Sequence, residues 1–136
     1  MPDSNISIPV FLKSLPAIAL LDDEILSALR DLESADEEEP FFNSVIETFV
    51  LETPLLIAML ASALRANDMS SIQHHAHQLK GLCANLGIHR LCSLCDIIEG
   101  NASVTGALSL SRLGDLLEKT YAESIIELES RWKVEL

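Results

Sequence analysis

The stretch 74-HHAHQLKGLCANLG-87 determines how the rest of the chain is interpreted. All four histidines of the chain lie between positions 74 and 89. The apolar residues at 79, 82, 83 and 86 recur at helical spacing, and Gly87 is of the residue type that most often ends a helix. We therefore predict a helix over this stretch, beginning near Asp68 or Ser70, since either side chain can cap its N-terminus.

The helical period separates the histidines. With 3.6 residues per turn, one face of this helix carries the residues that should meet the core. These are Ile72, His75, Leu79, Leu82, Cys83 and Leu86. His77 falls almost opposite this face, so we expect it in solvent, whereas His75 is expected to be a half-buried structural histidine.

Lys80 and Gly81 follow His77 by one helical turn, on the exposed side. A glycine inside a helix costs about 1 kcal/mol relative to alanine, so a functional gain should offset it. Close helix packing would be such a gain, but the outward placement of Gly81 disfavours it. We expect Gly81 to let another macromolecule approach the imidazole, and Lys80 to stabilise negative charge on a transferred group.

The rest of the chain predicts an all-α protein. It has 136 residues, 49% of them apolar and 4% aromatic, as expected of one helix-rich domain. Helical spacing recurs from Leu21 to Leu32, from Phe41 to Asn67 with Pro54 inside, from Leu91 to Ile98, and from Leu110 to Trp132. The expected fold is an antiparallel four-helix bundle over residues 20–136 with an additional N-terminal helix. Residues 1–19 read as a lead-in or linker segment or a short helix, and 35–40 and 100–106 as loops.

The composition excludes several classes of function. The net charge of −12 disfavours nucleic acid and anionic membrane surfaces, which need a basic footprint. The longest uncharged apolar run, residues 53–64, is shorter than a membrane-spanning helix requires, and the N-terminus lacks the form of a signal peptide. Three clustered cysteines do not form a disulfide framework, so we expect a cytoplasmic protein.

Within this frame the sequence resembles the histidine-containing phosphotransfer (HPt) domains of two-component phosphorelays. The resemblance rests on Ala76, His77, Leu79, Lys80 and Gly81, with Gly87 six residues later and an apolar series after it. Upstream, the stretches 21-LDDEILSALRDL-32 and 41–72 look like the helices that lead into this signature. The resemblance covers roughly residues 20–130.

The resemblance implies a relay in which the Nε2 atom of His77 accepts a phosphoryl group from an aspartyl phosphate of a receiver domain and passes it to another receiver. Lys80 would stabilise the transferring charge and Gly81 would give access. No cofactor or metal of its own is implied, and Mg²⁺ would come with the receiver. No nucleotide-binding loop is evident, so ATP-dependent kinase activity is not expected, and whether to class this carrier as an enzyme stays open.

The expected docking surface surrounds His77 and includes Gln73, His74, Ala84, Ile88 and Arg90. Lys80, Arg90, His74 and His89 could together form a local positive patch on an otherwise acidic protein. Receiver domains are the expected partners, and the chain is expected to be monomeric. A parent hybrid sensor kinase in the same polypeptide stays open.

Three alternatives remain. His74 and His77, together with Cys92 and Cys95, have spacings that could reach one metal ion, although Cys95 falls on an apolar face. A thiol redox role for the two cysteines lacks the usual strand–helix–strand setting. An HPt-like bundle that only binds another protein, without phosphotransfer, is the third.

Overall fold

The computed structural model describes residues 8–33, 40–102 and 110–136. The helices are α1 (Ile8–Ser14), the 3₁₀ turn η1 (Leu15–Ala17), α2 (Asp23–Arg30), α3 (Phe41–Ala66), α4 (Met69–Leu86), α5 (His89–Gly100) and α6 (Leu110–Arg131). No strand occurs in these ranges. Most of the expected acidic loop at 35–40 lies outside the described residues, namely positions 35–39. The same holds for positions 103–106 of the expected loop at 100–106.

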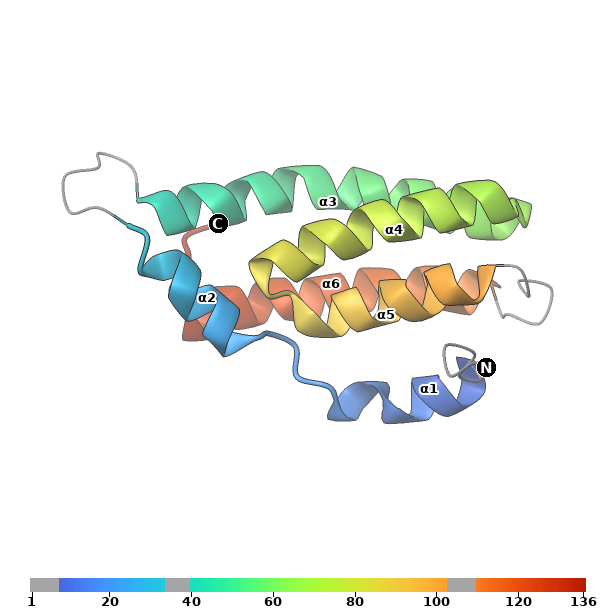
Figure 1. Cartoon of the computed structure of the whole chain (residues 1–136), viewed down its shortest axis with the longest axis horizontal. Coiled ribbons are helices and arrows are strands. Elements are labelled where there is room, and N and C mark those ends of the chain that lie inside the picture. Colours follow the sequence, from blue (N-terminus) through green and yellow to red (C-terminus); the bar gives the residue numbers. More distant parts are fainter. Residues whose placement is uncertain (1–7, 34–39, 103–109) are drawn as a thin grey trace.

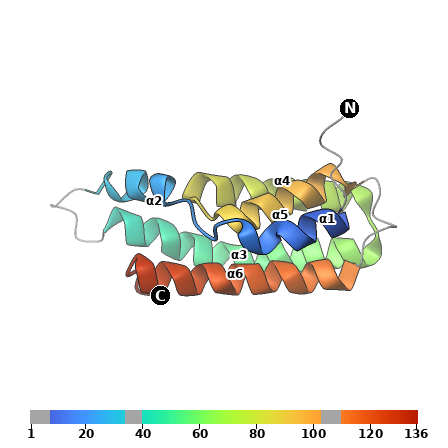
Figure 2. The ribbon, with the colours of Figure 1, turned by 90° about the horizontal axis from the view of Figure 1, so that it is seen from below.

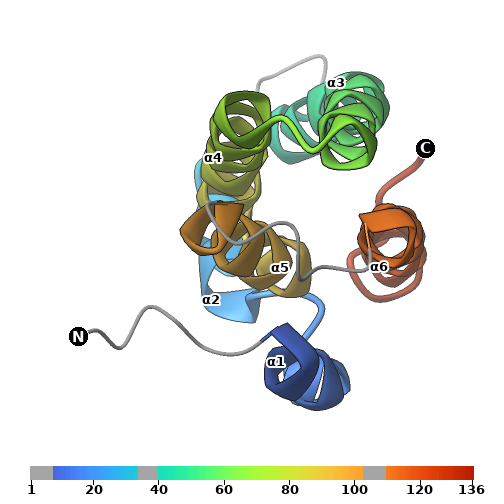
Figure 3. The same ribbon diagram turned by 90° about the vertical axis from the view of Figure 1, so that its right-hand side faces the viewer.

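Helices α3, α4, α5 and α6 form the antiparallel bundle (Figure 1). Viewed along its axis, α3 packs against α4 and α6, and α5 packs against the same two helices from the opposite corner (Figure 3). The core consists of buried aliphatic and aromatic side chains from all four helices, among them Phe49, Leu60, Leu79, Leu94 and Leu117. The predicted fold class, an all-α four-helix bundle with an additional N-terminal helix, is confirmed.

The helix ends follow the local chemistry of the sequence. The Asp22 carboxylate accepts hydrogen bonds from two backbone N–H groups in the first turn of α2, and the Asp68 carboxylate does the same for the Ser71 N–H in α4. Gly87 ends α4 at φ 74°, in the left-handed region that glycine adopts without strain. A Cβ at Gly87 would lie 3.0 Å from the Asp22 carbonyl oxygen, so this glycine also allows α2 to approach the α4–α5 turn.

Pro54 lies inside α3, which nevertheless continues as one helix over 26 residues. A proline has no N–H, so the carbonyl of Val50, four residues earlier, loses its helical hydrogen bond. The Tyr121 hydroxyl from α6 donates a hydrogen bond to this carbonyl oxygen at 3.2 Å. A side chain of a neighbouring helix therefore satisfies the backbone group that the proline leaves unpaired.

The N-terminal segment packs on the outside of the bundle (Figure 2). Ile8, Phe11 and Leu15 are buried against the core. Arg90 of α5 donates hydrogen bonds to the carbonyl oxygens of Ile18 at 2.7 Å and Pro16 at 3.1 Å. Residues 8–18 are thus fixed to the bundle, whereas the division of the chain at residue 19 stays a prediction.

By length and composition alone, α3 could cross a membrane. A core helix of a water-soluble protein has the same properties, and nine residues of α3 are buried. Its opposite side is far less covered, since Leu51 and Leu55 are both exposed.

Candidate functional site

Helix α4 presents His77 to solvent, as predicted. Ala76 and Leu79 on the same helix are fully buried, and this anchoring turns the His77 side chain outward, where 71% of it is exposed. His75 is half-buried, and its Nδ1 atom has no hydrogen-bond partner among the described residues. The helical period therefore separated the two histidines correctly.

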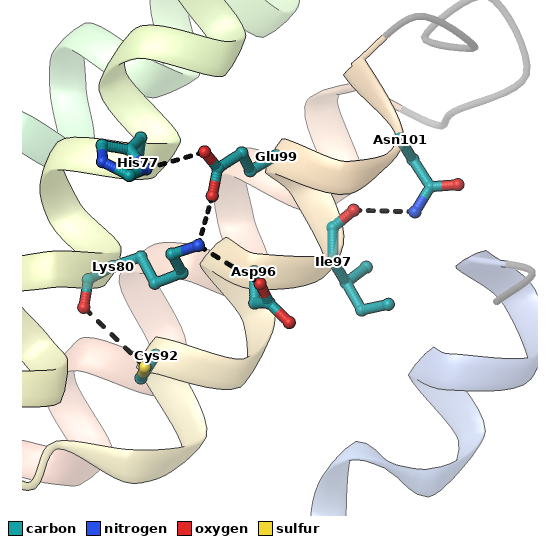
Figure 4. Close-up of polar contacts among 7 residues, drawn as sticks. All are labelled: His77, Lys80, Cys92, Asp96, Ile97, Glu99 and Asn101. Atoms are coloured by element: carbon teal, nitrogen blue, oxygen red, sulfur yellow. Dashed lines mark hydrogen bonds and ion pairs between the residues drawn. The ribbon is translucent and has the colours of Figure 1, made fainter. Parts of the chain in front are cut away.

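Glu99 of α5 connects the two residues that the sequence singled out (Figure 4). Its Oε2 atom lies 2.8 Å from Nδ1 of His77, and its Oε1 atom lies 2.5 Å from Nζ of Lys80. Lys80 also reaches Oδ1 of Asp96 at 3.4 Å. One carboxylate thus joins the imidazole and the ammonium across the α4–α5 interface.

These contacts favour the charged forms of Glu99 and Lys80. Partial burial raises the pKa of the Glu99 carboxyl, but the hydrogen bonds from Lys80 and His77 outweigh this effect and leave the pKa below its ordinary value. The hydrogen bond with Glu99 raises the pKa of Lys80, more than its burial lowers it. At neutral pH the site therefore holds a carboxylate and an ammonium in contact.

The position of Glu99 also selects a tautomer of His77. A carboxylate only accepts hydrogen bonds, so the neutral imidazole bonds to it by carrying its proton on Nδ1. The lone pair is then on Nε2, the far end of an exposed ring. A nucleophile of this kind can attack an electrophile that approaches from outside the protein.

Gly81 has no packing role in the described chain. A Cβ built on it meets no atom within 4 Å, apart from the backbone of its own helix. Close helix packing therefore does not explain a glycine at this position, and the open space lies one turn from His77. A large partner could use this space to approach the imidazole.

The expected docking residues divide into two groups. Gln73, His74 and Ala84 are exposed on α4, so their contact with a partner stays a prediction. Ile88 was wrong as a surface residue, because it is fully buried where the chain turns inward between α4 and α5.

Arg90 is largely engaged within the chain, so its contact with a partner stays a prediction. Its guanidinium is committed to the Pro16 and Ile18 carbonyls, and it lies 3.9 Å from Glu123 of α6. Pairing with two carboxylates offsets the charge of Lys80, and the expected positive patch of Lys80, Arg90, His74 and His89 stays a prediction. Within the described ranges, the ion pairs of His77 and Lys80 involve the carboxylates of Glu99 and Asp96.

Sequence reasoning missed Glu99, although a signal for it exists. In an antiparallel helix pair, residues equally distant from the turn lie opposite each other. His77 and Glu99 are both 11 residues from position 88, and Lys80 and Asp96 are both 8 residues from it. Applying this mirror relation to the polar residues of α5 would have identified both carboxylates.

The alternative metal and thiol sites gain no support. Cys95 is buried, and burial raises the pKa of its thiol and of Cys92. Cys92 lies against the Lys80 carbonyl oxygen at 3.7 Å. Within the described ranges, no group of three or more His, Cys, Asp or Glu side chains could hold one ion.

Comparisons with known proteins show the family and the fold of this chain. The model of the Hpt domain family matches residues 44–132. Multistep phosphorelay regulator 1 of Schizosaccharomyces pombe is 29% identical over 85 residues, which are 62% of this chain and 28% of that protein. The chain therefore corresponds to less than a third of this relative.

Solved structures show the same fold. The histidine-containing phosphotransfer protein B (HptB) of Pseudomonas aeruginosa PAO1 superposes with a TM-score of 0.70 at 26% identity, covering 86% of this chain and 97% of that one. The histidine-containing phosphotransfer protein MtHPt2 of Medicago truncatula superposes with a TM-score of 0.69 at 23% identity, covering 98% and 93%. This second likeness concerns the fold alone.

Proposed function

Because this chain belongs to the Hpt domain family, we propose that it is a phosphorelay intermediate that receives a phosphoryl group on Nε2 of His77 from the aspartyl phosphate of a receiver domain and transfers it to the aspartate of another. The observation that carries this proposal is the hydrogen bond between Glu99 and Nδ1 of His77. It leaves Nε2 both nucleophilic and accessible.

The proposed transfer balances within the two proteins. The Nε2 lone pair of His77 attacks phosphorus, the N–P bond forms, and the P–O bond to the receiver's aspartate breaks as its carboxylate leaves. The proton stays on Nδ1, so the phosphorylated ring carries positive charge beside Glu99. The carboxylate stabilises this charge, and the return or onward transfer reverses the same bonds.

Lys80 would act on the phosphoryl oxygens. An ammonium has three N–H donors, and the contacts with Glu99 and Asp96 account for two of them. The third can meet the transferring group, whose charge is spread over its equatorial oxygens. The two carboxylates would thus fix where the ammonium lies before the partner arrives.

The partner would supply the remaining chemistry. A receiver's acidic pocket would bring Mg²⁺, and the space beside Gly81 would admit its surface. The exposed residues Gln73, His74 and Ala84 would border this contact. A cytoplasmic setting suits such a relay, and the limited coverage of the fission-yeast relative is compatible with a larger parent protein, including a hybrid sensor kinase.

The test uses a receiver domain carrying labelled phosphate, mixed with the wild-type protein, His77→Gln and His74→Gln. His74 is the matched control because it is an exposed histidine on the same helix. We expect acid-labile, base-stable label on the wild type and His74→Gln, and none on His77→Gln. If a panel of receivers and kinases leaves the wild type unlabelled, the chain is a binding module without phosphotransfer.

A further inference from the structure

The outward side of α3 carries large apolar side chains that the described residues leave uncovered. Leu51 is 81% exposed, Leu55 66% and Met59 38%. These residues are spaced by four, with Ser62 and Ala66 continuing the same line along the helix. The line from Leu51 to Ala66 is called the α3 seam below.

The α3 seam lies directly opposite the core side of the helix. At 100° per residue, its positions are about 180° from the buried residues Ile46, Ile57, Leu60 and Leu64. An amphipathic helix on the surface of a bundle normally turns a polar face to solvent. Helix α3 instead has two apolar faces, and the bundle explains only one of them.

A hollow lies beside one end of the seam. It has a volume of ≈ 290 Å³ and is bounded by Met59, Ser62, Ala63 and Ala66 of α3 together with Asp68, Ser71 and His75. The small side chains of α3 give the hollow its width. Leu51, the most exposed leucine among the residues that the structure describes, projects from the other end of the same seam.

We propose that α3 pairs antiparallel with α3 of a second copy of this chain, about a two-fold axis near residue 57. In this register, a residue of one copy and a residue of the other lie at the same height along the paired helices when their numbers add up to 114. Leu55 then lies at the height of Met59 of the second copy, and Leu51 at the height of the hollow that Ala63 lines. Leu55 and Met59 would pack against each other across the axis, as side chains do between paired helices.

The charges beside the seam fit the same arrangement. Glu47 and Arg65 are 18 residues apart, which is five helical turns, so they lie on the same flank of α3. In the proposed register Glu47 of one copy lies about 3 Å along the axis from direct opposition to Arg65 of the other, within reach of long side chains. Two-fold symmetry makes this pair twice.

This self-complementarity favours a second copy over other occupants. A chain of net charge −12 would be repelled by an anionic membrane. A partner helix that carried charges of a single sign would pair with either Glu47 or Arg65, but not with both. The pairing also leaves the phosphotransfer site free. His77 contacts α5, which lies in the corner of the bundle opposite α3 (Figure 3). The proposed dimer would carry two outward-facing sites, in contrast to the monomer that the sequence led us to expect.

Sedimentation velocity over a range of protein concentrations tests the proposal. The wild type should show a concentration-dependent dimer, and Leu55→Lys should raise its dissociation constant at least tenfold. Ile126→Lys on α6 is the matched control, because Ile126 is 63% exposed and lies outside the seam. Circular dichroism should show unchanged helicity for both variants.

A charge exchange tests the register itself. Glu47→Arg should weaken the dimer about threefold, as expected for losing two exposed ion pairs, and adding Arg65→Glu should restore it. A wild type that is monomeric at all concentrations overturns the proposal, as does a dimer that Leu55→Lys does not weaken. Binding of a monomer to neutral phosphatidylcholine vesicles through Leu55 would also overturn it and assign the seam to a membrane.

Discussion

The Oε2 atom of Glu99 lies 2.8 Å from Nδ1 of His77, across the interface between α4 and α5. This contact places a proton acceptor behind the exposed ring and directs the lone pair of Nε2 toward solvent. The same carboxylate holds Lys80, so one residue of α5 orients both functional side chains of α4. The reactivity of the site therefore depends on the packing of two helices.

Replacing Glu99 should slow phosphotransfer without unfolding the bundle. Glu99→Ala removes the acceptor from His77 and leaves Lys80 paired with Asp96 alone. The loss of the charge-assisted hydrogen bond to His77 corresponds to about a tenfold lower rate. Rapid-quench measurement of label transfer from a phosphorylated receiver gives this rate. Asp96→Asn is the control, since Asp96 contacts Lys80 but has no contact with His77 in the described structure. Equal rates for Glu99→Ala and wild type would contradict the orienting role.

The stability contributed by Glu99 should depend on pH in a defined direction. Desolvation raises the pKa of this carboxyl, but the hydrogen bonds from Lys80 and His77 lower it by more than desolvation raises it. The pKa in the folded state is therefore below its ordinary value. Such a group stabilises the fold above its unfolded pKa, about 4.3, and this contribution disappears as the pH falls through the folded pKa. Urea unfolding at pH 7 should show Glu99→Gln to be less stable than wild type by up to about 1 kcal/mol. At pH 3 the difference in the free energy of unfolding between the two proteins should be smaller. A difference that grows on acidification would contradict the predicted downward shift of the Glu99 pKa.

The elements of this fold were predictable where the determining chemistry is local. Asp68 and Gly87 mark the two ends of α4 through hydrogen bonds and backbone angles within a few residues, and the structure places the ends there. The exposure of His77 follows from the helical period alone. These features need no knowledge of neighbouring helices.

The missed features depend on contacts between distant segments. Arg90 looked like a surface cation because its partners, the carbonyls of Pro16 and Ile18, are more than 70 residues away in the sequence. The role of Glu99 likewise depends on how α5 packs against α4. A single sequence shows the residue types of such pairs, but only the packing shows which of them meet.

Substitutions of Gly81 should affect the stability of the fold and the rate of phosphotransfer differently. Gly81→Ala adds a methyl group where no atom lies within 4 Å and improves helix propensity, so the free energy of unfolding should rise by up to about 1 kcal/mol. Gly81→Gln should preserve helicity but lower the transfer rate, because its longer side chain occupies the space beside His77. Thermal unfolding and label transfer measure the two effects. Unchanged transfer by Gly81→Gln would remove the access argument.

The hydroxyl group of Tyr121 should stabilise the fold only when residue 54 is proline. The Tyr121 hydroxyl donates to the Val50 carbonyl, and burial raises the pKa of this phenol, so it remains a donor at neutral pH. Tyr121→Phe keeps the ring against Phe49, where the centroids are 5.9 Å apart, and should cost about 1 kcal/mol by leaving the carbonyl unpaired.

In a Pro54→Ala background the new N–H can bond Val50 within the helix, so the cost of Tyr121→Phe should fall close to zero. Urea unfolding of the four proteins gives the coupling between the two positions. Ser130→Ala is a suitable control, because its hydroxyl bonds the Glu127 carbonyl on the surface of α6, away from Pro54. Equal costs of Tyr121→Phe in both backgrounds would show that the hydroxyl does not replace the missing helical hydrogen bond.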